Sequence, residues 1–132
     1  MNSESYRRTS GSEPLGDGEI VYRALLRKQW LDRNTGEVSP DAYFLRKSKN
    51  EQGLSVRMAS ACTPEEFAAR FRNCYGIASL KVGGIRSLGL DVIPDSPSHA
   101  QILGLPYRED DRNRADRLAE LLAKQSSIVW LP

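Results

Sequence analysis

The side chain best suited to proton transfer in this 132-residue sequence is its only histidine, His99. Imidazole titrates near neutral pH, as a general acid or base requires. His99 follows the turn-forming stretch PDSPS and opens an apolar run. Asp91 and Asp95 lie close enough in the sequence to orient its ring. The alternative, in which His99 only bonds a backbone carbonyl within the turn, stays open.

Two short runs, VYRAL at 21–25 and GLSV at 53–56, hold a second pair of candidate residues, Arg23 and Ser55. Taken in this order, the runs resemble the opening of the ADP-ribosyltransferase fold. The resemblance implies that Arg23 holds the phosphates of a dinucleotide and that Ser55 supports a nicotinamide pocket. The chain departs from that family late in the sequence, where a catalytic glutamate is expected on a strand. The alternative is an arginine paired with an acid and an ordinary strand serine.

Arginine is the dominant base, with fourteen arginines against five lysines in a chain of net charge +2. Its planar guanidinium group binds carboxylates and phosphates and suits protein interfaces. The alternative is that the arginines form salt bridges scattered over the surface. Arginines interleaved with aromatic residues also suit single-stranded nucleic acid. The candidate binding residues are Trp30, Arg70, Arg72, Arg86 and Trp130, with Arg57 on the same surface.

The sequence predicts no metal site and no cofactor. Cys62 and Cys74 do not have the spacing of zinc ligands, and one histidine does not complete a four-ligand site with them. The glycine pair in KVGGIRSLG is followed by neither a lysine–serine pair nor an expected helix, so it does not match a phosphate-binding loop. We expect a tight turn at Gly83–Gly84.

The elements that must position these residues follow from periodicity. Residues 1–18 are poor in apolar side chains and predict a flexible arm, followed by one domain over 19–132. Helices are predicted over 64–75, with Thr63 as N-cap and Glu66 completing a capping box, and over 110–125. The expected strands lie at 19–26, 42–46, 53–58, 77–82, 88–94, 100–105 and 127–132. Strand runs between helices predict an α+β fold with a mostly antiparallel sheet and two helices.

These features favour a small cytosolic accessory protein that acts through protein–protein contacts rather than catalysis. The alternative is a small toxin-like enzyme, an ADP-ribosyltransferase or a nuclease, that uses His99 and Arg23. The third hypothesis is a nucleic-acid-binding module. The sequence contains no apolar run of membrane-spanning length and no secretory signal at its start, so we expect a cytoplasmic protein without membrane contact.

Overall fold

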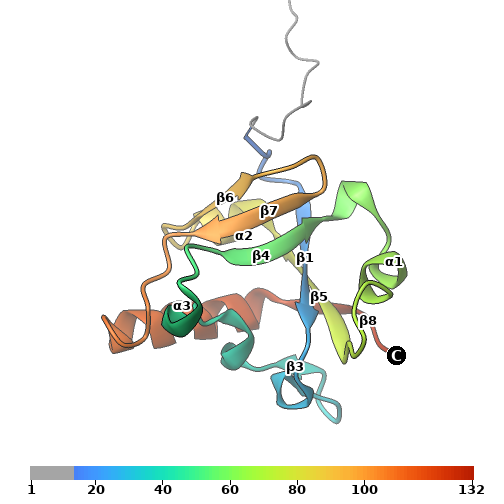
Figure 1. Ribbon diagram of the computed structural model, residues 1–132, viewed down its shortest axis with the longest axis horizontal. Helices are drawn as coiled ribbons and strands as arrows, with labels where there is room; N and C mark the ends of the chain where they lie inside the picture. The colour runs from blue at the N-terminus through green and yellow to red at the C-terminus, as the bar shows by residue number, and fades with distance from the viewer. Residues whose placement is uncertain (1–13) are drawn as a thin grey trace, which may run out of the picture.

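Alternating apolar residues build an antiparallel sheet in the computed structural model, which describes residues 14–132 (Figure 1). Its strand order is β6-β7-β4-β1-β5-β8. The strands are β1 (Ile20–Leu25), β4 (Leu54–Met58), β5 (Gly76–Lys81), β6 (Asp91–Pro94), β7 (His99–Leu103) and β8 (Ser127–Trp130). A short hairpin joins β2 (Leu31–Asp32) to β3 (Glu37–Val38). The predicted α+β fold with a mostly antiparallel sheet is confirmed.

The sheet is continuous on one side of β1 and opens on the other. β1 pairs with β5 along its whole length, from Ile20 to Leu25. It pairs with β4 at two positions only, Val21 with Met58 and Tyr22 with Arg57. In Figure 1, β4, β6 and β7 run across the direction of β1 and β5. The strong twist therefore separates β1 from β4 beyond Tyr22, and this opening receives the side chains described below.

The larger core lies on the sheet face covered by α3 (Arg112–Gln125) and the 3-10 helix η3 (Pro40–Tyr43). The buried stripe of α3 is the predicted one: Ala115, Leu118, Ala119 and Leu122. Asp111 caps this helix by accepting a hydrogen bond from the Arg114 amide. Tyr43 is fully buried, and its hydroxyl lies 2.5 Å from the Ser126 hydroxyl. Burial raises the pKa of Tyr43.

The opposite sheet face carries a smaller cluster under α1 (Pro64–Ala68). The predicted capping box is confirmed: the Glu66 amide donates to Thr63, and the Thr63 amide donates to the Glu66 carboxylate. The predicted extension of this helix to residue 75 is wrong. After Ala68 the chain tightens into turns, and the Tyr75 amide donates to the Leu25 carbonyl. That bond draws residue 75 into line with the start of β5 and ends the helical path.

Two further local predictions are wrong. The expected strand at 42–46, paired in a hairpin with 53–58, is instead η3 followed by extended chain, because Ala42 and Tyr43 are buried in the main core. β4 pairs with β7 and β1. The expected turn at Gly83–Gly84 is the short helix α2 (Val82–Arg86), whose Val82 and Ile85 are buried. The remaining 3-10 turns are η2 (Lys28–Trp30), η4 (Lys47–Lys49) and η5 (Ala59–Ala61).

The segment 14–18, which the sequence assigns to the arm, packs on the domain in the structure. Leu15 is 2% exposed and belongs to the main core. The Asp17 carbonyl accepts a hydrogen bond from the Gly83 amide. The rest of the predicted arm, residues 1–13, lies outside the described residues. Across the described part of the chain, every helix is too short or too polar to cross a membrane.

Leu15→Ala is therefore expected to lower the free energy of unfolding by about 2–4 kcal/mol, since it removes buried methyl groups and leaves a cavity. Urea denaturation measures this difference. Leu131→Ala is the matched control: Leu131 is 49% exposed, and its loss is expected to change stability by less than about 0.5 kcal/mol. An unchanged urea midpoint for Leu15→Ala contradicts the core position of this residue.

Candidate anion-binding site

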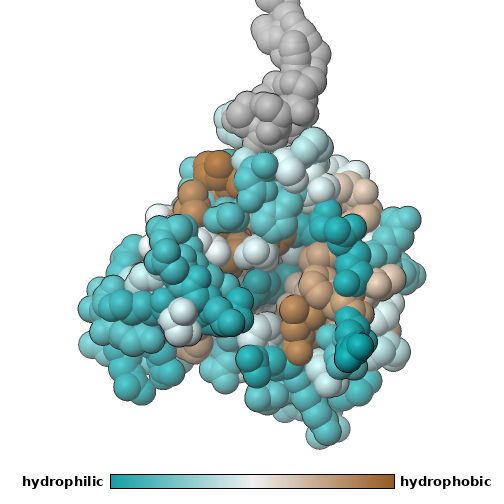
Figure 2. Space-filling model, in the orientation of Figure 1, coloured by the Kyte–Doolittle hydropathy of each residue, from teal (hydrophilic) through white to brown (hydrophobic). Residues whose placement is uncertain are grey.

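The face of the sheet that carries α1 is hollowed into a cleft of about 1140 Å³. Figure 2 shows the hollow in the middle of the view, with hydrophilic residues over α3 to its left. Its floor comes from β1, β4 and β7, and one wall comes from α1 and the turn after it. The other wall comes from η2, η3 and the loops around Arg46 and Arg108. Segments distant in the sequence therefore build this site together.

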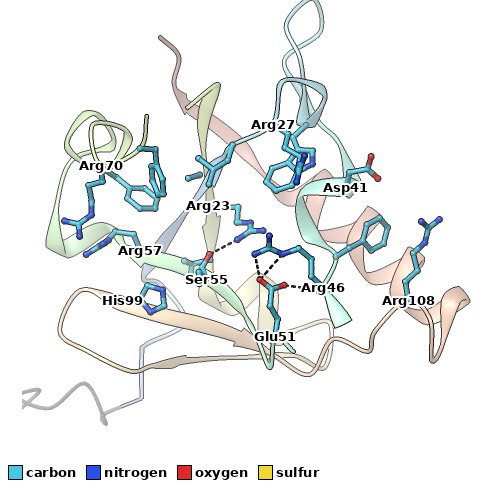
Figure 3. Close-up of a pocket in the computed structure, with 17 residues that line it drawn as sticks. Arg23, Arg27, Asp41, Arg46, Glu51, Ser55, Arg57, Arg70, His99 and Arg108 are labelled. Carbon is cyan, nitrogen blue, oxygen red and sulfur yellow. Dashed lines mark hydrogen bonds and ion pairs between the residues drawn. The ribbon is translucent and has the colours of Figure 1, made fainter. Parts of the chain in front are cut away.

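Positive charge dominates the cleft, which we call the arginine cleft. Its charged lining residues are six arginines and two acids: Arg23, Arg27, Arg46, Arg57, Arg70, Arg108, Asp41 and Glu51 (Figure 3). Two of the guanidinium groups are neutralised by carboxylates. Arg46 bonds Glu51 at 2.7 Å, and Arg108 bonds Asp116 at 2.7 Å. Within residues 14–132, the other four have no carboxylate partner.

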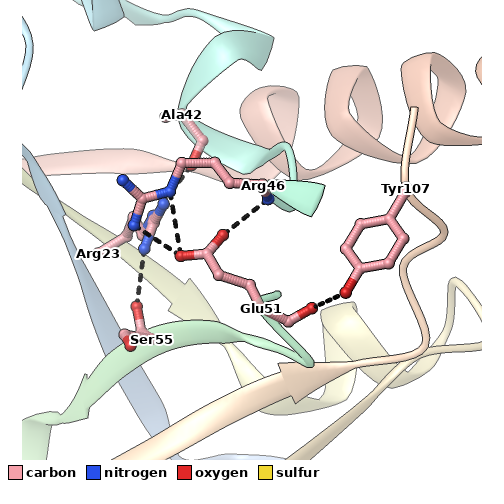
Figure 4. Close-up of polar contacts among 6 residues, drawn as sticks. All are labelled: Arg23, Ala42, Arg46, Glu51, Ser55 and Tyr107. Atoms are coloured by element: carbon pink, nitrogen blue, oxygen red, sulfur yellow. Dashed lines mark hydrogen bonds and ion pairs between the residues drawn. The ribbon is translucent and has the colours of Figure 1, made fainter. Parts of the chain in front are cut away.

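Arg23 fills the opening between β1 and β4 (Figure 4). Its Nε donates to the Ala42 carbonyl at 2.9 Å, and one terminal nitrogen donates to the Ser55 carbonyl at 3.0 Å. The guanidinium carbon lies 5.6 Å from the centre of the Trp30 ring. Burial lowers the pKa of Arg23, and the neighbouring Tyr43 and Glu51 oppose that effect. Arg23 thus joins η3 to β4, and no carboxylate of residues 14–132 is bonded to its guanidinium group.

The Arg46–Glu51 pair stands beside Arg23 and fixes the adjacent wall. Both oxygens of Glu51 are occupied: one accepts from the Arg46 amide at 2.8 Å, and the other from its guanidinium. Although burial raises the pKa of Glu51, the hydrogen bonds from Arg46 hold it below its ordinary value. The Tyr107 hydroxyl donates to the Glu51 carbonyl at 2.5 Å. Both carboxylate oxygens of Glu51 therefore bond Arg46, and neither bonds Arg23.

Arg57 presents an unused donor. Its guanidinium carbon lies 5.4 Å from the centre of the Phe67 ring, and one terminal nitrogen donates to Ser98 at 2.8 Å. Its Nε is buried and makes no hydrogen bond within the described part of the chain. An unpaired buried donor is costly, because it has lost water and gained no replacement. Because Arg57 lines the cleft, its guanidinium charge acts on an anionic ligand bound there.

His99 lies on the cleft floor directly across from Arg57 in the β4–β7 ladder. Its Nδ1 is 2.7 Å from one oxygen of Asp95, whose other oxygen accepts from Gln101 at 3.2 Å. The carboxylate therefore holds the ring in a fixed orientation. The pairing with Asp95 that the sequence allows is present in the structure, whereas Asp91 is bonded to Arg86.

The candidate catalytic residues Arg23, Ser55 and His99, which come from three strands, all line the arginine cleft. Of the candidate binding residues, Trp30 and Arg70 line it as well. The other three do not. Arg72 is exposed outside the cleft, Trp130 packs against the cluster under α1, and Arg86 bonds Asp17 and Asp91, which raise its pKa. Six further residues line the cleft and are not apparent as site residues from the sequence alone: Arg27, Asp41, Phe44, Arg46, Glu51 and Arg108.

Neither cysteine belongs to the cleft lining. Cys62 and Cys74 are free thiols, and burial raises the pKa of Cys74. Among residues 14–132 no group of three histidine, cysteine or acidic side chains is arranged to hold a metal ion.

In comparisons with known proteins, no family model, no curated protein and no solved structure matches the chain.

Arg23→Ala is expected to lower the free energy of unfolding by about 2–3 kcal/mol, because two backbone carbonyls lose their donor and a gap opens behind Trp30. Arg27→Ala is the control: Arg27 lines the same cleft but is exposed and makes no hydrogen bond through its side chain in the described structure. Urea denaturation compares the two. Equal unfolding midpoints for Arg23→Ala and the unmodified protein contradict the bridging role of Arg23.

Proposed function

We propose that the arginine cleft binds single-stranded nucleic acid. The observation that carries this proposal is a set of four guanidinium groups that line one cleft and have no carboxylate partner among residues 14–132: Arg23, Arg27, Arg57 and Arg70. Phosphates are suitable acceptors, since guanidinium groups bind them through paired, charge-assisted hydrogen bonds. A ligand that brings several phosphates would occupy several of these donors at once.

Aromatic side chains favour a strand over isolated phosphate. Trp30 and Phe44 lie on one wall of the cleft, and Phe67 and Phe71 lie on the other. Arginines stack on three of these rings, with Arg108 lying 4.8 Å from the centre of Phe44. Bases stack on aromatic rings and on guanidinium planes alike, without regard to sequence. The cleft volume of about 1140 Å³ also exceeds that of most small-molecule pockets.

Contact with a protein partner, the function that the sequence favours, has weaker support. One anchor predicted for it, Trp30, has Arg23 against its ring, and the other, Trp130, packs against the cluster under α1. Each of the two rings therefore already has an intramolecular contact on one side. An acidic peptide would nevertheless satisfy the same arginines, so it belongs in the test as a competitor.

Fluorescence anisotropy with a labelled single-stranded RNA of about 12 nucleotides tests the proposal. We expect binding that weakens steeply with salt, with a slope of about −3 in log K against log salt if four phosphates are neutralised. Arg70→Ala is expected to weaken binding several-fold and to reduce that slope by about 0.7. Arg72→Ala is its matched control, since Arg72 is an exposed arginine two residues away that lies outside the cleft.

Three outcomes contradict the proposal. The first is no binding at low salt, and the second is an equal loss for Arg70→Ala and Arg72→Ala. The third is an acidic peptide that binds more tightly than RNA of the same charge. A mononucleotide or a dinucleotide that competes as well as the strand would replace the strand with a small nucleotide ligand.

A further inference from the structure

The Asp95–His99 pair has the form of a prepared proton acceptor at the cleft floor. Since Asp95 lies 2.7 Å from Nδ1 of His99, a proton on Nδ1 is stabilised and the lone pair is left on Nε2. Nε2 makes no hydrogen bond to any residue that the structure describes. The ring is also fixed through the backbone, because the His99 amide donates to the Ser96 hydroxyl at 3.0 Å. The imidazole is therefore oriented to accept a proton at Nε2 from a ligand in the cleft.

Arg57 supplies positive charge beside that imidazole. Arg57 and His99 are directly paired across β4 and β7, so their side chains share one sheet face with Cβ atoms about 5 Å apart. The buried Nε of Arg57 has no acceptor in the described structure. Arg57 lines the cleft, and a positive charge fixed beside the reacting groups stabilises negative charge that develops during a reaction.

Within residues 14–132, no hydroxyl or thiol group is hydrogen-bonded to the His99 ring. Ser55 is paired with Gln101 and therefore lies diagonally from His99 in the ladder. The Cα atoms of such diagonal neighbours are roughly 7 Å apart. In this structure the His99 ring is hydrogen-bonded to Asp95, and no hydrogen bond joins it to the Ser55 hydroxyl. The two cysteines lie outside the cleft. A reaction that uses His99 as base must take its nucleophile from the ligand.

We infer that the arginine cleft cleaves the RNA strand that it binds, with His99 as the general base. This inference rests on the proposed function. Nε2 takes the proton of a ribose 2′-hydroxyl, and the 2′-oxygen attacks the adjacent phosphorus. The bond from phosphorus to the 5′-oxygen then breaks, and that oxygen receives the proton from the imidazolium. Arg57 stabilises the negative phosphorane oxygens between these events. The products are a 2′,3′-cyclic phosphate and a free 5′-hydroxyl, and no water, metal or cofactor is consumed.

Incubation of the purified full chain with labelled single-stranded RNA, with DNA of the same sequence and with 2′-O-methyl RNA tests this inference. We expect all three strands to bind, because their phosphates are alike. Only the unmodified RNA is expected to be cut, and its fragments end in 2′,3′-cyclic phosphate. His99→Gln keeps one hydrogen-bonding group toward Asp95, and it is expected to lower the cleavage rate at least about 100-fold while RNA binding is retained. Arg72→Ala, outside the cleft, is expected to cut at the unmodified rate.

The outcomes separate the two proposals. RNA that binds and stays intact overturns the cleavage inference and leaves the binding function in place. RNA that does not bind overturns both. Cleavage that persists unchanged in His99→Gln, or that occurs on DNA or 2′-O-methyl RNA, overturns the role of His99 and the 2′-hydroxyl. A thermal melt of His99→Gln that matches the unmodified protein shows that any loss of cleavage is not a loss of fold.

Discussion

The half-buried charge of Arg23 lies between two separating strands and is held by backbone carbonyls. β1 leaves β4 after two residue pairs, and the guanidinium occupies the opening by bonding Ala42 and Ser55. A carboxylate at this position would close an ion pair and neutralise the floor of the cleft. Carbonyl dipoles hold the charge in place without cancelling it, so the cleft keeps a positive field that a ligand can use. The pKa of Arg23 is lowered because desolvation disfavours its charged form.

The other arginines divide by position. Those on the outer wall are paired, Arg46 with Glu51 and Arg108 with Asp116. Arg57 on the floor and Arg70 on the α1 wall have no carboxylate partner within the part of the chain that the structure describes. A modest net charge of +2 therefore conceals a strongly positive surface in one place.

The stabilisation that the Arg46–Glu51 pair contributes to the fold depends on pH. Because the folded protein lowers the pKa of Glu51, this pair stabilises the fold above the ordinary carboxylate pKa and loses that contribution as the pH falls through the folded value.

Local patterns in the sequence predict the elements better than the site. The capping box at Thr63 and the buried stripe of α3 could be predicted because each depends on residues within a few turns of helix. The lengths of α1 and η3 could not, since a backbone bond from Tyr75 to Leu25 and the burial of Tyr43 against α3 decide them. The grouping of Arg23, Ser55 and His99 depends on strand order, which periodicity does not contain. The opposite wall comes from irregular segments whose arginines look like ordinary surface charges until the fold brings them together.

Arginine side-chain NMR gives the most direct test of the central claim that the cleft holds guanidinium donors awaiting a phosphate strand. Nitrogen-15 spectra of the Nε–H groups, assigned with single Arg→Lys variants, are recorded during titration with a short RNA strand. We predict that the Nε–H signal of Arg70, which is exposed and lines the cleft, shifts toward a hydrogen-bonded position and becomes protected from exchange with water. We also predict that Arg72 and Arg86 are unaffected. A titration that shifts Arg72 or Arg86 and leaves Arg70 unchanged contradicts the claim that the cleft binds the strand.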